Sequence, residues 1–393
     1  MATDIVGMHD MLNRYTSCLP QNRPDTAPSC DGTAIALLGS TGFLGPYIVA
    51  SLLEVYRDSK IFCINRSADG AQRTTAAVMG VLGDGNSTAL QRLQFMVADI
   101  TQPNLGLDAV QATILASEVN GLIFNAWEPN WSKPLAYFDP FLRAVRNAVD
   151  FCASAPGHPG ITFVSSICSV GNWPLVHPAQ PIVPEEVIWD SRSAMPHGYG
   201  ESKCVAEQLL AKAHGASGLR VNVVRAGQIG GPSQPRVKAW PRPGWIHSIL
   251  ETSLKLGYFP MHVQPLDWIP VDSFAAGIVN STKTSPGAGT VQVFNMVHPQ
   301  PGPWKMLYDT LTTNFGITMG TTSLSDWLDR LDRREFKLHG LLRATGNGRE
   351  HNMSFRNANA LRTLPEVVPL SEELLAEWVR GWKLSARELK AKM

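Results

Sequence analysis

Tyr199 and Lys203 stand four residues apart in the run HGYGESKCVAEQLL, and no other pair in the chain combines chemistry and spacing so closely. On a helix this spacing puts a phenol and an ammonium on one face. The positive charge favours the phenolate, so we expect it to lower the pKa of the phenol and to suit Tyr199 for proton transfer near neutral pH. The same spacing is also typical of an ordinary surface helix, so the pair needs support from the rest of the sequence.

A glycine-rich run, GSTGFLG from Gly39 to Gly45, supplies part of that support. It follows TAIALL, which predicts a buried strand, and precedes PYIVASLLEVY, which has helical periodicity. In a dinucleotide-binding fold such glycines let the chain turn at Gly39, approach a pyrophosphate at Gly42 and pack helix on strand at Gly45. A glycine loop in an α/β protein that binds no nucleotide is the alternative interpretation.

The end of the next predicted strand, KIFCIN, indicates which dinucleotide would bind. NAD sites usually carry Asp or Glu at this point, whereas here Asn65 is followed by Arg66. No carboxylate is present to repel a 2′-phosphate, and a guanidinium pairs well with one. We therefore expect NADPH rather than NADH, with Arg66 as the main discriminator and Arg73 as a second candidate. The alternative is that Arg66 is a solvated loop residue.

Three further apolar runs extend the predicted sheet. LQFMVADI carries Asp99 near its end, where a carboxylate would reach the adenine edge or simply close a turn. GLIFNAW ends at Asn125 and Ala126, where a cofactor loop is expected, and ITFVSS ends at Ser165 and Ser166. Strands that alternate with helices predict an α/β fold with a Rossmann-type, doubly wound parallel sheet covered on both faces.

The serines complete a set of groups suited to hydride transfer. A hydroxyl at the carboxyl edge of the sheet would donate a hydrogen bond to the oxygen of a carbonyl that receives hydride. Tyr199 would supply the proton, and Lys203 would hold both Tyr199 and the nicotinamide ribose.

Composition is that of a water-soluble enzyme. The 393 residues carry a net charge of +1 and 17% charged side chains, which gives no electrostatic reason to expect nucleic acid or an anionic membrane as a partner. The six cysteines have no metal-type spacing, so we expect reduced thiols, no metal and a cytoplasmic location. No secretory signal or membrane-spanning stretch is visible.

These motifs resemble the extended short-chain dehydrogenase/reductase superfamily. Within it, they are most similar to the terminal thioester reductase domains of fungal synthetase-like enzymes. The segments that carry this similarity are GSTGFLG, FNAW, FVSSICSVGNW, PHGYGESKCVAEQLL, VVRAGQIGG and LDWIPVD. The resemblance implies that Ser166, Tyr199 and Lys203 form the catalytic triad, although Ser166 takes a position that is often Thr in this branch. The pair Glu128 and Pro129 departs from relatives, as does Trp131, which is where acyl specificity is expected to begin.

The resemblance also implies the cofactor contacts. These are Thr41, Gly42, Phe43 and Leu44 in the pyrophosphate loop that Gly39 and Gly45 bound, Arg66 at the 2′-phosphate, Asn125 and Ala126 beside the cofactor, and the segment from Arg225 to Gly230, with Gln228, over the nicotinamide.

The activity implied by the resemblance is reductive release. An acyl or peptidyl chain on the phosphopantetheine of a carrier protein would take hydride from NADPH, pass through a hemithioacetal and leave as an aldehyde, with further reduction to an alcohol left open. A monomer is expected for this branch. Two other functions stay open: an extended-family reductase or epimerase acting on a free small molecule, and a redox-silent, NADP-sensing domain.

The expected domain boundaries follow the same resemblance. Residues 1–30 form a helix and linker, 31–235 a Rossmann domain with a return segment at about 266–298, and 236–265 with 299–393 a smaller, mostly helical lobe that faces substrate and carrier. Trp245, Ile249 and Tyr258 would line an acyl pocket or simply form core. The basic residues in this part would meet a phosphopantetheine phosphate or belong to a solvated loop; they are Arg236, Lys238 and Arg242.

Overall fold

The structure is a computed structural model that describes residues 2–21, 34–83, 88–234, 240, 244–284, 290–331, 342 and 353–382. The chain divides into two compact units. The first comprises Met1–Gly227, Asp272–Met296 and Ser354–Pro365, and the second comprises Gln228–Val271, Val297–Met353 and Glu366–Met393. Ser354–Pro365 thus lies in the first unit, whereas the sequence placed that segment in the C-terminal lobe. The linker expected after the first helix lies almost wholly outside the described residues.

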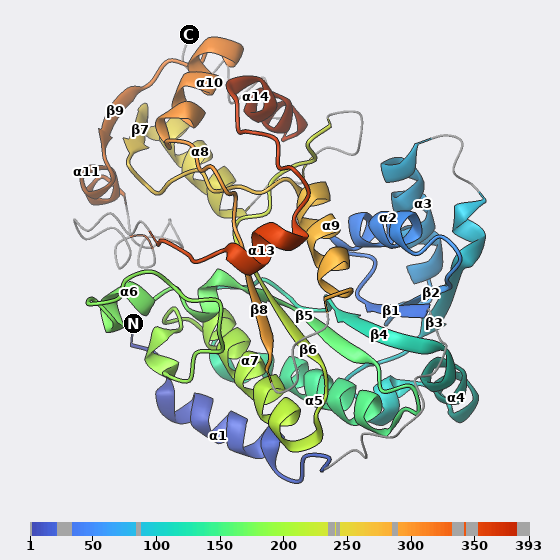
Figure 1. Cartoon of the computed structure of the whole chain (residues 1–393). Helices are drawn as coiled ribbons and strands as arrows, with labels where there is room; N and C mark the ends of the chain where they lie inside the picture. Colours follow the sequence, from blue (N-terminus) through green and yellow to red (C-terminus); the bar gives the residue numbers. More distant parts are fainter. Residues whose placement is uncertain are drawn as a thin grey trace. The chain divides into compact units, whose positions relative to one another are not determined.

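The first unit is built on a parallel sheet of seven described strands, with β1 and β4 at its centre (Figure 1). The strand order is β3-β2-β1-β4-β5-β6-β8, and each neighbouring pair is parallel. The strands are Ala34–Leu38 (β1), Ile61–Asn65 (β2), Leu93–Val97 (β3), Val119–Phe124 (β4), Gly160–Ser166 (β5), Val221–Ala226 (β6) and Gln292–Met296 (β8). The order reverses direction between β1 and β4, where such folds bind dinucleotides.

Helices cover both faces of this sheet, as the fully buried strand β1 requires. In Figure 1, α2 and α3 lie on one face and α5 and α7 on the other. The helices of this unit are Ile5–Thr16 (α1), Gly45–Val55 (α2), Gly70–Leu82 (α3), Ala109–Glu118 (α4), Asp139–Ser154 (α5), Trp173–Val176 (α6), Gly198–Ser217 (α7), Val271–Ser281 (α9, from Asp272 onward) and Ala358–Thr363 (α13). The doubly wound α/β fold predicted from the sequence is confirmed.

The N-terminal helix α1 packs on α5 and α7 rather than standing apart. Its buried face carries Met8, Met11, Leu12 and Tyr15. The side chain of Glu201 in α7 accepts a hydrogen bond from the backbone N–H of Asp4, at 2.9 Å, and so caps the start of α1. The helix expected within residues 1–30 is therefore present, and it packs on the first unit.

The second unit is smaller and mainly helical. It contains Gly244–Leu256 (α8), Lys305–Phe315 (α10), Leu324–Asp329 (α11) and Glu372–Gly381 (α14), together with a two-stranded parallel sheet of Tyr258–Met261 (β7) and Gly320–Ser323 (β9). Indole rings fill its interior: Trp240 lies against Trp268, Trp378 and Trp382, with ring centroids 5.2–5.4 Å apart. Across the described residues, no helix is long and apolar enough to cross a membrane.

Candidate functional site

The start of α7 brings Tyr199 to the carboxyl edge of the sheet. His197 caps this helix, because its Nδ1 accepts a hydrogen bond from the backbone N–H of Gly200 at 3.1 Å. Gly198 is required here, since a Cβ at that position would lie 2.4 Å from the carbonyl carbon of Pro134. The phenol of Tyr199 is half-buried. Local capping and one close backbone approach therefore fix where Tyr199 emerges from the helix.

Ser166, the last residue of β5, is the serine that meets Tyr199. Its hydroxyl accepts a hydrogen bond from the backbone N–H of Cys168 at 3.2 Å, and it lies close enough to the Tyr199 phenol to lower the pKa of that phenol. The hydroxyl of Ser165 points elsewhere and donates to the carboxylate of Glu207. Successive strand residues face opposite sides of a sheet, so only one of the two serines lies beside the phenol. The geometry supports Ser166 in the proposed triad.

Lys203 lies one turn after Tyr199 and is almost completely buried. Its Nζ donates to the carbonyl oxygen of Val164 at 2.7 Å and lies 5.9 Å from the centroid of the Tyr199 ring. Burial lowers the pKa of Lys203 well below its usual value, and the charge of Glu207 acts in the opposite direction. The three residues expected to form a triad are therefore brought together.

The expectation that Lys203 lowers the pKa of Tyr199 is wrong. Burial is the largest cause, and it raises the pKa of the Tyr199 phenol well above its usual value, while the neighbouring Ser166 hydroxyl lowers it only in part. Desolvation disfavours the charged phenolate, and this effect outweighs the lowering by Ser166. Tyr199 is consequently a protonated phenol at neutral pH, which is the form that donates a proton.

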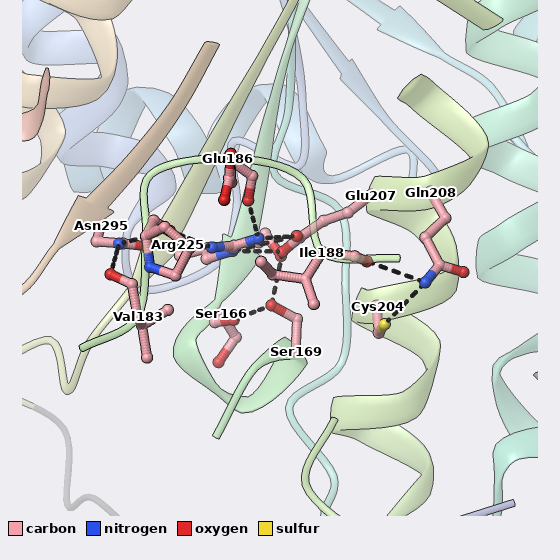
Figure 2. Close-up of polar contacts among 12 residues, drawn as sticks. Ser166, Ser169, Val183, Glu186, Ile188, Cys204, Glu207, Gln208, Arg225 and Asn295 are labelled. Atoms are coloured by element: carbon pink, nitrogen blue, oxygen red, sulfur yellow. Dashed lines mark hydrogen bonds and ion pairs between the residues drawn. The ribbon is translucent and has the colours of Figure 1, made fainter. Parts of the chain in front are cut away.

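A buried ion pair between Glu207 and Arg225 lies in the same part of the sheet as Ser166 (Figure 2). The Glu207 carboxylate accepts from the hydroxyls of Ser165 and Ser169, and its Oε2 accepts from Arg225 Nη2 at 2.7 Å. Arg225 also donates to the carbonyl oxygens of Pro184 and Glu186 and to the side chain of Asn295. We call Ser165, Ser169, Glu207, Arg225 and Asn295 the Glu207 network. It ties α7 to β5, β6 and β8.

The sequence reading missed the role of this network. A signal was present, because Tyr199, Lys203 and Glu207 recur every four residues and so share one face of α7. The resemblance placed Arg225 in a segment that closes over the nicotinamide, whereas the structure pairs its fully buried guanidinium with Glu207.

The glycine loop joins β1 to α2 at the point where the strand order reverses. Gly39 has a φ of +92°, and a Cβ on it would lie 3.0 Å from the backbone of Ala126. The side-chain amide of Asn125 donates to the carbonyl oxygen of Gly39 at 2.9 Å. A Cβ on Gly45 would lie 2.4 Å from the carbonyl oxygen of Ser40. Gly39 therefore makes the turn and Gly45 allows the close packing of helix on strand, as predicted from the motif.

Gly42 lies at the exposed tip of the same loop, and a Cβ added to it would meet no atom within 4 Å. Thr41 and Phe43 are half-buried beside it, and Leu44 is buried. Helix α2 starts at Gly45 with no side-chain cap and no acidic residue in its first turn. Open space and uncapped N–H groups at a helix start suit a pyrophosphate.

The end of β2 offers no carboxylate to a ribose. The amide of Asn65 is buried and hydrogen bonds with Ser40, so it stabilises the glycine loop. Arg66 follows it and is exposed. Asp99, just after β3, accepts hydrogen bonds from the backbone N–H and the hydroxyl of Thr101. These bonds close a turn, which is the second of the two roles expected for Asp99. Hydrogen bonds from Thr101 and then the charge of Arg66 lower the pKa of Asp99.

Several residues that were expected to contact cofactor, substrate or carrier belong to the second unit. Gln228 lies in the second unit, where its Oε1 accepts from the indole of Trp245 at 2.7 Å. In the same unit Ile249 is fully buried and so belongs to the core, whereas Tyr258 is exposed. The basic run is not among the described residues; its members are Arg236, Lys238 and Arg242.

The loop after β4 continues from the cofactor edge to the triad. Glu128 accepts from the phenol of Tyr137 at 2.6 Å, which lowers the pKa of Glu128. Trp131 stacks on His197, with ring centroids 6.0 Å apart. His197 in turn stacks on Tyr199 at 6.2 Å. Trp131, where acyl specificity was expected to begin, therefore reaches the proposed proton donor through the ring of His197.

The residues present fit a nicotinamide dinucleotide. The positive φ of Gly39, the open space at Gly42 and the uncapped start of α2 form a pyrophosphate cradle, and Asn125 links that cradle to the strand beside the triad. Fold and site together define a Rossmann-type dinucleotide-binding protein whose Ser, Tyr and Lys arrangement is that expected for the extended short-chain dehydrogenase/reductase superfamily.

Comparison with known proteins agrees with this class. The NAD-binding family model described as "Male sterility protein" matches residues 37–278, and the chain belongs to that family. It is similar to the carboxylic acid reductase of Neurospora crassa, with 31% identity over 95% of this chain and 37% of the relative. The adenylate-forming reductase Nps11 of Serpula lacrymans is 30% identical over 96% of this chain and 38% of its own length.

Solved structures confirm the fold. The terminal R domain of the myxalamid PKS-NRPS pathway superposes with a TM-score of 0.76 at 20% identity, covering 97% of this chain and 98% of that one. A thiolation-reductase di-domain of an archaeal nonribosomal peptide synthetase gives 0.70 at 20% identity, with 95% and 79% covered. The resemblance to terminal reductase domains is thus confirmed, and the chain spans under two fifths of the two curated relatives it matches here.

Proposed function

We propose that this chain reduces a carrier-bound acyl or peptidyl thioester to an aldehyde with NADPH. The observation that carries the proposal is the convergence of Ser166, Tyr199 and Lys203 at the sheet edge, next to a loop that is shaped for a dinucleotide. Relatives named as a carboxylic acid reductase and as adenylate-forming reductases support the reaction class. Solved relatives that contain a thiolation domain support the carrier as partner.

The side chains divide the work of this reaction. A reduced nicotinamide supplies a hydride to the carbonyl carbon when it is bound. The hydroxyls of Ser166 and Tyr199 donate hydrogen bonds to the carbonyl oxygen, on which negative charge develops. Tyr199 gives its proton to that oxygen, and its raised pKa keeps the proton available until the stronger base appears. Lys203 stabilises the phenolate that remains.

Loss of the thiol completes the proposed release. Breakage of the C–S bond of the hemithioacetal frees the phosphopantetheine thiol and leaves a carbonyl carbon in the product aldehyde. The carrier tether keeps the acyl group at a high local concentration, so tight binding of the acyl chain itself is not required. A monomeric state and a cytoplasmic location stay predictions, as do the boundaries of the substrate lobe.

Reduced-nicotinamide consumption with thioesters tests this function. Purified protein is mixed with NADPH and a panel of aminoacyl, aryl and polyketide thioesters, on pantetheine and on a carrier, and the aldehyde is trapped with a hydrazine. We expect one aldehyde released per NADPH, with a lower KM on the carrier. Turnover of a sugar nucleotide or free ketone, with no thioester consumed, would replace this proposal by a small-molecule reductase or epimerase.

Arg66 is proposed to select NADPH, because it is exposed at the end of β2 with no carboxylate at the preceding position. Arg66→Ala should weaken NADPH binding by about tenfold to a hundredfold and NADH binding by less than threefold, as for loss of a charge-assisted pair. The measurement is the Kd of each cofactor by nicotinamide fluorescence. Arg57→Ala removes an exposed arginine before β2 begins and is the matched control. Equal losses for both cofactors would show that Arg66 does not read the phosphate.

A further inference from the structure

The ammonium of Lys203 lies in a pocket lined by aromatic rings. Its Nζ is 4.0 Å from the centroid of the Trp127 ring and 4.6 Å from that of Phe163. The Tyr199 ring is the third wall, at 5.9 Å. We call Trp127, Phe163 and Tyr199 the aromatic cage. At these distances the negative faces of the rings attract a cation, and the attraction is strongest where water is excluded.

The ammonium has few other ways to be stabilised. An ammonium carries three N–H donors, and the carbonyl oxygen of Val164 is the one hydrogen-bond acceptor recorded for it among the described residues. Charged and titratable groups that act on it from the packed elements are Glu207 in its own helix, Cys168 after β5 and Tyr199. The Glu207 carboxylate is already paired with Arg225. Ring faces therefore add to the stabilisation that the charge of Glu207 gives to the ammonium.

Trp127 is fixed by packing rather than by a hydrogen bond. Its indole stacks on Phe138 at 6.4 Å with an angle of 14° between planes, and it meets Phe163 edge to face at 5.7 Å. Its buried Nε1 makes no hydrogen bond within the part of the chain that the structure describes. The ring face turned to Lys203 is thus set by neighbouring rings, which leaves that face available to the cation.

Trp127 also connects the proposed cofactor loop with the triad. It comes two residues after Asn125, which holds the carbonyl of Gly39 in the glycine loop. Its backbone N–H donates to the carbonyl oxygen of Asn125 at 3.1 Å. The same short segment therefore carries the contact to the proposed cofactor cradle and the contact to Lys203.

We propose that Trp127 is a positioning residue of the site: its indole face holds the Lys203 ammonium beside Tyr199 and keeps it charged. The expected effect of Trp127 on turnover rests on the proposed function. Its expected effect on the charge of Lys203 does not depend on that function.

Fluorination of the indole tests the charge directly. Codon suppression replaces Trp127 with mono-, di- and trifluorotryptophan, which weakens the ring's negative face stepwise with little change in shape. The pKa of Lys203 is then measured, without turnover, from the pH dependence of the Lys203 Cε chemical shift in protein carrying ¹³C-labelled lysine. Each step should lower that pKa, by about one unit in total. No shift across the series would overturn the proposal.

Substitutions test the same contact by turnover. Trp127→Leu keeps apolar bulk without a ring face and should lower kcat for thioester reduction by about tenfold, whereas Trp127→Phe should recover most of the loss. Trp173→Leu is the matched control, because Trp173 is a buried indole in a separate cluster with Val170 and Val183. Equal losses in Trp127→Leu and Trp173→Leu would overturn the proposal by showing general destabilisation alone.

The two failures can be told apart. If the unaltered protein reduces no thioester, the proposed function fails, and the pH titration of Lys203 across the fluorination series still decides the role of Trp127. If thioesters are reduced but fluorination leaves both the Lys203 pKa and kcat unchanged, the role of Trp127 fails and the function stands.

Discussion

Ser165 and Ser166 are neighbours on β5 but belong to regions with opposite properties. Ser165 donates to Glu207 in a buried network whose carboxylate accepts from two hydroxyls and a guanidinium. Ser166 lies with Tyr199 and Lys203, where burial shifts the pKa of both titratable groups away from their usual values. A satisfied polar network resists change, whereas shifted groups suit proton transfer. The comparison teaches that one region builds the site and the other performs the chemistry.

Breaking the network should cause the largest loss of stability. Glu207→Gln removes the charge that pairs with the fully buried Arg225, and we expect the free energy of unfolding to fall by about 3–5 kcal/mol. Urea unfolding monitored by circular dichroism measures it. Ser169→Ala, which removes one hydroxyl from the same carboxylate, is the control and should cost about 1 kcal/mol. A loss below 1 kcal/mol in Glu207→Gln would mean that the pair does not anchor α7.

Exchanging the two serines for alanine sharpens the comparison. Ser166→Ala should lower kcat by about a hundredfold, because it removes a donor to the developing oxyanion, with little change in the unfolding midpoint. Ser165→Ala should do the reverse, lowering stability by about 1 kcal/mol and kcat by less than fivefold. Steady-state kinetics and thermal unfolding of both variants give the result. Similar effects of the two changes would end the division between the two regions.

The histidine that caps α7 should make stability depend on pH. Burial lowers the pKa of His197 from 6.5 to about 4, so the unfolded chain binds a proton that the folded protein refuses between those values. The neutral His197 therefore makes its full contribution to the free energy of unfolding above about pH 6.5. This contribution, about 3 kcal/mol at most, is lost as the pH falls toward 4. The measurement is urea unfolding at pH 7 and pH 4.5.

His197→Asn is the matched variant, because asparagine also caps helix N-termini but does not titrate. It should be less sensitive than the unaltered protein to the drop in pH. An identical pH dependence in both proteins would show that His197 is not responsible.

The sequence predicted what depends on local spacing. Glycine-loop geometry at Gly39 and Gly45 and the five strands named in advance follow from short-range pattern, and the structure contains them. Tyr199 and Lys203 share a helix, so their proximity needed only the 3.6-residue period.

What the sequence did not predict depends on contacts between distant segments. Ser165 and Glu207 are 42 residues apart, and the pairing of Arg225 links β6 to α7. The direction of the Tyr199 pKa was wrong because the expectation counted the nearby charge and could not include burial. Trp127 was read as part of a family motif, and its place over Lys203 follows from the packing of α7 on β5 and the pairing of β5 with β4.

A comparison of Tyr199→Phe with the unaltered protein tests the central claim most directly. Rapid mixing of each protein with NADPH and a thioester substrate, followed at the reduced nicotinamide band in a single turnover, measures hydride transfer, and fluorescence titration measures NADPH binding. The account predicts a hydride-transfer rate at least a thousandfold lower in Tyr199→Phe, with the Kd for NADPH changed less than threefold. A rate within tenfold of the unaltered protein would contradict the claim that the Tyr199 phenol is the proton donor.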